Sequence, residues 1–142
     1  MKVSARNRLE GSIAAVNPGA VNTEVVLDLG GSDTLVAVVT SESAKRMGLA
    51  VGKRAMGLVK APWVTIVTDA ANYRFSARNQ FAGKVTRVEK GAVNSEIAIR
   101  LAGGTTISAV VTNEAVAELQ LASGKPATAL IKASQVIVAV SA

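Results

Sequence analysis

SARNRLEGSIAAVNPGAVN, residues 4–22, is repeated as SARNQFAGKVTRVEKGAVN at residues 76–94. When residue 4 is placed on residue 76, the rest of the chain aligns with itself without a gap. Self-similarity at a fixed spacing is the signature of a duplicated structural unit. The sequence therefore predicts two tandem domains, residues 1–70 and 71–142.

The residues retained in both copies are mostly polar residues and glycine. Strand-like stretches change residue but keep their character, as between Val25-Val26-Leu27 and Ile97-Ala98-Ile99, which is the kind of exchange that cores tolerate. Beyond the opening block, the copies also share Val-Val-Thr, at 38–40 and 110–112, and Lys-Ala, at 60–61 and 132–133. These retained polar blocks are the candidates for a shared function.

Hydrophobic patterning predicts the same elements in each copy. In first-copy numbering, we expect strands at 4–16, 21–29, 35–39 and 55–67 and a short helix at 43–47. Asn17-Pro18-Gly19 is a turn signal, Thr40 is a helix N-cap, and Pro62 interrupts the last strand. This order predicts an all-β fold with one short helix per domain, arranged as two tandem OB-like small barrels. The short join at 69–74 indicates domains that pack together.

Composition excludes several kinds of site. The 142 residues carry a formal net charge of +6 and include no cysteine and no histidine. Disulfides, thiolate metal sites and the commonest general base are therefore absent. We find no pair of nucleophile and base, and so expect neither an enzyme nor a catalytic cofactor. No signal peptide or membrane-length apolar run is present, so we expect a cytoplasmic protein without membrane contact.

The retained side chains are almost all hydrogen-bond donors. Arginine offers a planar fork of charged donors, lysine a point charge, and serine and threonine hydroxyl donors, while a helix N-terminus presents free backbone N–H groups. Such a set suits a small dianion. Hydrogen phosphate carries a proton that needs an acceptor, and leaving that group unpaired is costly. Molybdate, tungstate and sulfate carry no such proton at neutral pH.

Taken together, these motifs resemble the molybdenum-binding Mop domain, a TOBE-type domain, and two copies filling the chain resemble the tandem-Mop molbindins. The resemblance implies cytoplasmic storage and homeostasis of molybdate or tungstate by a homotrimer, with oxyanion sites between subunits. The same paired domains form the effector module of a molybdate-responsive transcription regulator. Because no DNA-binding segment precedes Met1, we expect the storage protein and no nucleic-acid partner.

The resemblance also implies which residues bind the oxyanion. In the first copy they are Ser4, Ala5, Arg6, Asn7, Thr40, Lys60 and Ala61. In the second copy they are Ser76, Ala77, Arg78, Asn79, Thr112, Lys132, Ala133 and Ser134. Further sites near the symmetry axis would be lined by Gly19, Ala20, Val21, Asn22, Gly91, Ala92, Val93 and Asn94. No residue is expected to ligate a metal cation directly. Pro62 replaces Ser134, so the first-copy site is expected to lack one donor.

Three other interpretations remain open from the sequence alone. An OB fold with a basic pI is compatible with nucleic-acid binding, although only four aromatic residues are available for base stacking. The chain is also compatible with a purely structural oligomerisation module. Finally, individual residues have structural explanations: Thr40 and Thr112 as helix caps, and Lys60 and Lys132 as lysines that snorkel to solvent.

Overall fold

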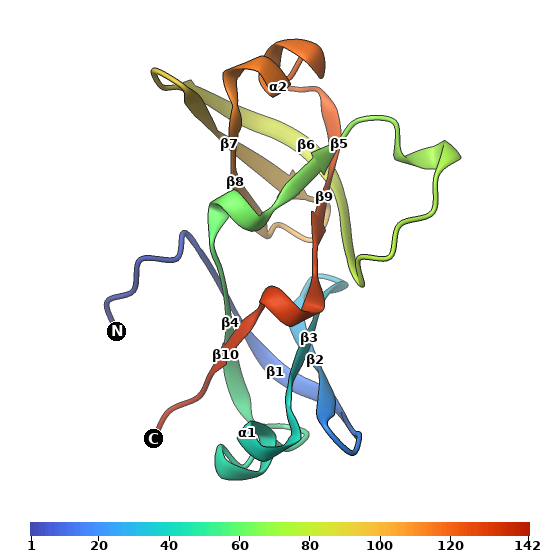
Figure 1. Ribbon diagram of the computed structural model, residues 1–142, viewed down its shortest axis with the longest axis vertical. Coiled ribbons are helices and arrows are strands. Elements are labelled where there is room, and N and C mark those ends of the chain that lie inside the picture. Colours follow the sequence, from blue (N-terminus) through green and yellow to red (C-terminus); the bar gives the residue numbers. More distant parts are fainter.

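A computed structural model describes residues 1–142, and two five-stranded antiparallel sheets lie one above the other along its long axis (Figure 1). The first repeat supplies β1 (Asn7–Pro18), β2 (Asn22–Gly30), β3 (Asp33–Thr40) and β4 (Arg54–Val59). The second supplies β6 (Asn79–Lys90), β7 (Asn94–Leu101), β8 (Thr106–Thr112) and β9 (Pro126–Ile131). The predicted fold class, mostly β with two OB-like units, is confirmed.

Each sheet is completed by a strand from the other repeat. β5 (Thr65–Val67) pairs antiparallel with β9, and β10 (Ile137–Ala139) pairs with β4. The strand orders are therefore β10-β4-β1-β2-β3 and β5-β9-β6-β7-β8. Both repeats contribute backbone hydrogen bonds to both sheets, so the expectation that the two units are closely packed is met by an exchange of strands.

The predicted strand at 55–67, with its interruption at Pro62, is two separate strands, because the chain turns between β4 and β5. A 3₁₀ turn, η1 (Ala61–Trp63), separates them, and the N–H of Trp63 bonds to the carbonyl of Lys60 at 2.9 Å. The second repeat has the same turn, η3 (Ala133–Gln135), with Ser134 in place of Pro62. Proline is therefore not required for the break. The turns η1 and η3 lie in the middle of the molecule, which we call the waist (Figure 1).

The hydrophobic core runs through both sheets without a break. Side chains alternate between buried and exposed along the first part of β1, so that Leu9 and Ile13 face inward, as expected of a strand with one face on the core. A single cluster of 25 buried residues joins the two repeats, from Leu9 to Val138. This continuity means that neither repeat has a separate core.

The two short helices lie at opposite ends of the long axis (Figure 1). They are α1 (Ser41–Arg46) and α2 (Asn113–Glu118). Thr40 and Thr112 cap them, accepting hydrogen bonds from the N–H groups of Ser43 and Ala115, each at 3.1 Å. The predicted cap is confirmed, and the helix begins two residues earlier than predicted. Neither helix, nor any other in the chain, has the length and apolarity needed to cross a bilayer.

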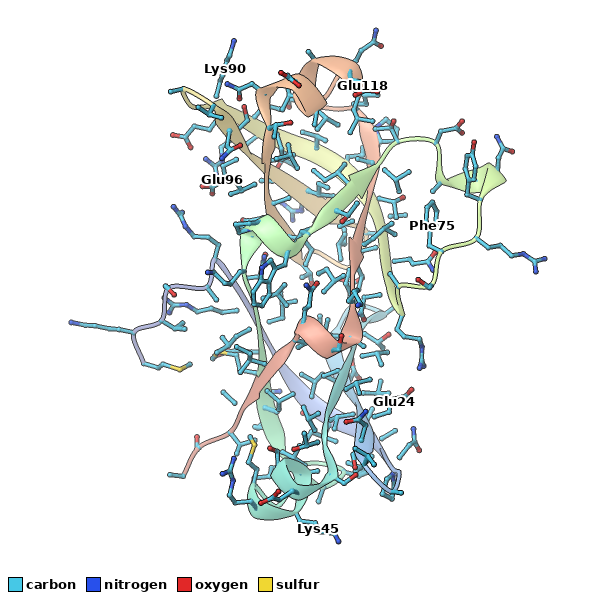
Figure 2. All side chains as sticks on the ribbon, viewed as in Figure 1. Glu24, Lys45, Phe75, Lys90, Glu96 and Glu118 are labelled. Carbon is cyan, nitrogen blue, oxygen red and sulfur yellow. The ribbon has the colours of Figure 1, made fainter.

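The join between the repeats loops away from the body of the molecule. It contains a third 3₁₀ turn, η2 (Ala70–Asn72), and Tyr73 is largely exposed there. Phe75 follows on the same loop (Figure 2), with its ring centroid 6.4 Å from that of Tyr73.

Candidate functional site

The arginine of each repeat reaches across to a glutamate of the other. Arg78 Nη1 lies 2.5 Å from Glu24 Oε2, and Arg6 Nη1 lies 3.4 Å from Glu96 Oε2. Glu24 and Glu96 lie in opposite halves of the molecule (Figure 2). Both arginine side chains remain more than half exposed, so their remaining donors face solvent.

The glutamates are residues whose role the sequence analysis missed. They are retained at equivalent positions in both copies, and that was the available signal. The hydrogen bond from Arg78, with a second from Asn17 at 3.1 Å, holds the pKa of the Glu24 carboxyl below its ordinary value. An ionised carboxylate therefore occupies one edge of the Arg78 guanidinium.

Asn7 and Asn79 join the two repeats and leave no side-chain donor for an anion. The Asn79 amide nitrogen donates to the carbonyls of Val36 at 2.8 Å and Ile131 at 3.2 Å, and its oxygen accepts from the Val36 N–H at 2.7 Å. Asn7 makes the same three bonds, to Ser108 and Val59. Both residues are about 2% exposed. Their side chains thus have a structural role, and their predicted place in the oxyanion site stays a prediction.

Lys132 lines a cleft of about 410 Å³ at the join of the repeats. Ser76, Ala77 and Lys132 of the predicted second-copy site line it together. Trp63, from the first repeat, forms part of the same wall. The cleft thus combines a cation and a hydroxyl with an aromatic surface, and β5 is the element that brings Trp63 there.

Lys60 has a different environment from Lys132. Its ammonium nitrogen lies 5.6 Å from the centroid of the Trp63 ring, within the range of a cation–π contact. The equivalent of Trp63 in the second repeat is Gln135. Both lysines are exposed, whereas Ala61 and Ala133, which follow them, are buried. The lysine head groups are therefore available for binding, and the two alanines offer only their backbone.

The Gly-Ala-Val-Asn blocks form exposed hairpin ends beside the helix starts. The register pairs Asn22 with Thr40 and Asn94 with Thr112. The Ser41 N–H bonds to the carbonyl of Val21 at 2.8 Å. Val21 and Val93 are 74% and 71% exposed. Each hairpin end is thus an open surface with the threonine close to it.

The structure brings some of the predicted residues together and separates others. A cleft of about 490 Å³ holds Arg6 of the first repeat with Gly91 and Asn94 of the second. Thr40, in contrast, starts α1 at one end of the molecule, whereas Lys60 follows β4 at the waist (Figure 1). Within one chain, the predicted first-copy set does not converge on one point. Ser4 is exposed and Ala5 is buried, both just before β1.

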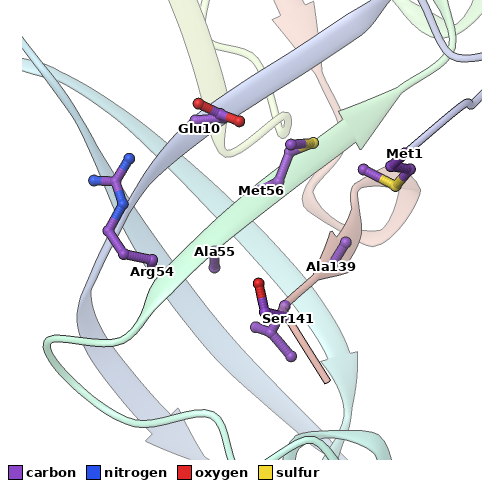
Figure 3. Close-up of a pocket in the computed structure, with 8 residues that line it drawn as sticks. Met1, Glu10, Arg54, Ala55, Met56, Ala139 and Ser141 are labelled. Atoms are coloured by element: carbon purple, nitrogen blue, oxygen red, sulfur yellow. The ribbon is translucent and has the colours of Figure 1, made fainter.

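A separate groove of about 400 Å³ contains none of the predicted residues. Met1, Glu10 on β1, Met56 on β4 and Ala139 on β10 lie along it (Figure 3). Five of its eight lining residues are hydrophobic, and its one arginine, Arg54, donates to Ser12 at 3.2 Å. We therefore assign the candidate site to the arginine and lysine clefts.

The TOBE domain matches residues 3–66 and again residues 76–138. The chain belongs to the TOBE-domain family. Its two TOBE domains, in tandem, account for nearly all of the sequence, and the resemblance described above is thereby confirmed.

Curated relatives align with both TOBE domains of the chain. The chain is 46% identical over 140 residues to the molybdenum transport protein ModE of Herbaspirillum seropedicae, covering 99% of the chain and 52% of ModE. It is 43% identical over 139 residues to the molybdenum-pterin-binding protein MopA of Rhodobacter capsulatus, covering 98% and 52%. The tandem TOBE chain thus spans about half the length of these curated relatives.

A solved structure is similar over its full length. The cytoplasmic molybdate-binding protein ModG, in a crystal form with molybdate bound, superimposes with a TM-score of 0.95 and is 54% identical. The alignment covers 99% of the tandem TOBE chain and 100% of ModG. Similarity of this extent covers both repeats.

Proposed function

We propose that this protein binds molybdate, and by the same chemistry tungstate, and serves in the cytoplasm for storage and homeostasis of these oxyanions. The observation that carries the proposal is the full-length similarity to ModG, which was solved with molybdate bound. The exposed donors at Arg6, Arg78, Lys60 and Lys132 support it, because they are suited to a small dianion. The role is one of binding, not catalysis.

The proposed binding residues are those of the retained blocks, with one change. Arg6, Arg78, Lys60 and Lys132 supply charge, Ser4, Ser76 and Ser134 supply hydroxyls, and the alanines at 5, 61, 77 and 133 supply backbone. Thr40 and Thr112, together with the hairpin ends at 19–22 and 91–94, form a second kind of site. The side chains of Asn7 and Asn79 are left out, because their hydrogen bonds are already made within the protein.

We further propose that the chain forms a homotrimer in which neighbouring chains complete the sites. Thr40 lies at an end of the molecule and Lys60 at the waist, so one chain does not place both on the same small anion. The exposed valines at the hairpin ends, Val21 and Val93, suit a contact between chains. Light scattering should give a mass three times 14.5 kDa. A monomer at micromolar concentration would contradict sites shared between chains.

Selectivity provides the test of the function itself. Isothermal titration should show strong binding of molybdate and tungstate, weak binding of sulfate and almost none of phosphate. The reason is that the lysine ammonium and the backbone N–H groups cannot accept a hydrogen bond from the proton of hydrogen phosphate. Phosphate binding equal to molybdate would show that an acceptor takes part, and Glu24 and Glu96 would then be the first residues to replace.

A further inference from the structure

Arg6 and Arg78 are equivalent by sequence repetition, but the residues around them differ in charge. The Arg6 cleft in the second repeat also contains Arg87, Lys90, Glu89 and Glu96. The equivalent positions in the first repeat are occupied by Ala15, Pro18, Asn17 and Glu24. Three cations and two carboxylates thus line the Arg6 cleft, whereas the equivalent set of residues includes only one cation, Arg78, and one carboxylate, Glu24.

This difference changes how firmly each arginine is held by its glutamate. Arg87 Nη2 donates to Glu96 Oε1 at 3.1 Å, while Arg6 lies 3.4 Å from the other oxygen, too long for a strong hydrogen bond. In the first repeat the donor to the other carboxylate oxygen, Glu24 Oε1, is the neutral amide of Asn17 at 3.1 Å, and not an arginine. Arg78 Nη1 donates a hydrogen bond to Glu24 Oε2 at 2.5 Å, so Glu24 occupies part of the Arg78 guanidinium.

The position of Arg87 is set by the backbone of β6. The β6–β7 pairing shifts register between Val85 and Arg87, and the β1–β2 pairing shifts between Ile13 and Ala15. A bulge inserts one residue and re-aims the side chains next to it. Both repeats share the bulge. The difference between the two carboxylate environments therefore comes from the side chain at this position, which is Ala15 in one repeat and Arg87 in the other.

We propose that Arg87 is a positioning residue which holds Glu96 away from Arg6, so that the Arg6 cleft accepts an oxyanion more readily than the Arg78 cleft. Arg87 engages the carboxylate that would otherwise compete with the anion for the Arg6 guanidinium. The proposal rests on the proposed function, and it makes the two classes of arginine site unequal in affinity. It also identifies Glu24 and Glu96 as internal competitors for those sites.

The test exchanges the residues at two equivalent positions of the repeats, Arg87 and Ala15. In an Arg78→Ala background, which removes the equivalent arginine, Arg87→Ala should weaken molybdate binding at the Arg6 cleft about five-fold, because Glu96 then pairs with Arg6 as Glu24 pairs with Arg78. The converse variant, Ala15→Arg in an Arg6→Ala background, should strengthen the Arg78 cleft by a similar factor. Alanine at position 87 should be tolerated, since Ala15 occupies the equivalent position, and melting curves check this.

Glu96→Gln distinguishes positioning from direct contact. With residue 96 neutral, the same Arg87→Ala change should alter molybdate affinity by less than about two-fold, because no competing carboxylate remains to be held. An equal loss in both backgrounds would mean that Arg87 contacts the anion directly, and would overturn the proposal. So would unchanged binding on Arg87→Ala alone, or no binding at all in the Arg78→Ala background. Failure of the unaltered protein to bind molybdate would instead refute the proposed function.

Discussion

Replacing Asn79 with alanine should lower the free energy of unfolding by about 3 kcal/mol. The side chain makes three hydrogen bonds to backbone groups of Val36 and Ile131, at 2.7, 2.8 and 3.2 Å. Alanine leaves those groups without partners in a place where Asn79 is only 2% exposed. An unpaired buried backbone group costs about 1–3 kcal/mol, and the Val36 groups, which are partly buried, regain some of this from water. Urea unfolding followed by circular dichroism measures the change.

A second substitution and a control make this result specific. Asn79→Asp keeps an acceptor for the Val36 N–H but faces two carbonyl oxygens with a carboxylate, so it should destabilise at least as much as alanine. Asn72→Ala, in the exposed turn η2, should change stability by less than about 0.5 kcal/mol. Equal effects of Asn79→Ala and Asn72→Ala would show that the bonds across the repeats add little. Asn7→Ala should behave like Asn79→Ala, since it makes the matching bonds.

Replacing Lys132 with alanine should weaken molybdate binding at its own class of site about 10- to 100-fold. A charge-assisted hydrogen bond contributes on the order of 1.5–3 kcal/mol, and each 1.4 kcal/mol is a factor of ten in the dissociation constant. The cleft keeps Ser76 and the backbone at Ala77, so binding should weaken without a change of fold. Titration should then show one part of the binding lost and another kept.

Lys60→Ala should cost a similar factor at the first-copy site. That site is expected to be weaker from the start, because Pro62 supplies neither a hydroxyl nor an N–H where the second copy has Ser134. Lys84→Ala, at another exposed lysine on β6, serves as the control and should leave binding unchanged. If both site variants bind like the parent, the two lysines only snorkel to solvent. If either variant unfolds, the retained lysines serve the structure.

Much of the fold was readable from local patterns. The alternation of residues such as Leu9 and Ile13 and the cap at Thr40 each depend on residues near one another in sequence, and the repeat is visible when the chain is compared with itself. Those patterns predicted the β-rich class and the short helix, and the retained polar blocks predicted the family. The Gly-Ala-Val-Asn blocks, which were predicted to line further oxyanion sites, are exposed.

The sequence by itself determined that two β-rich units carry matching sets of anion donors. The tertiary structure alone decided that β5 and β10 each complete the sheet of the other repeat. That exchange determines which distant residues come into contact. Strand pairing uses backbone groups that every residue except proline carries, so nothing in Thr65–Val67 or Ile137–Ala139 specifies β9 or β4 as partner. Once the chain crosses at η1 and η3, Asn79 reaches Val36 and Arg6 reaches Glu96. Contacts between residues so far apart in sequence follow from that path and leave no periodic signal in the sequence.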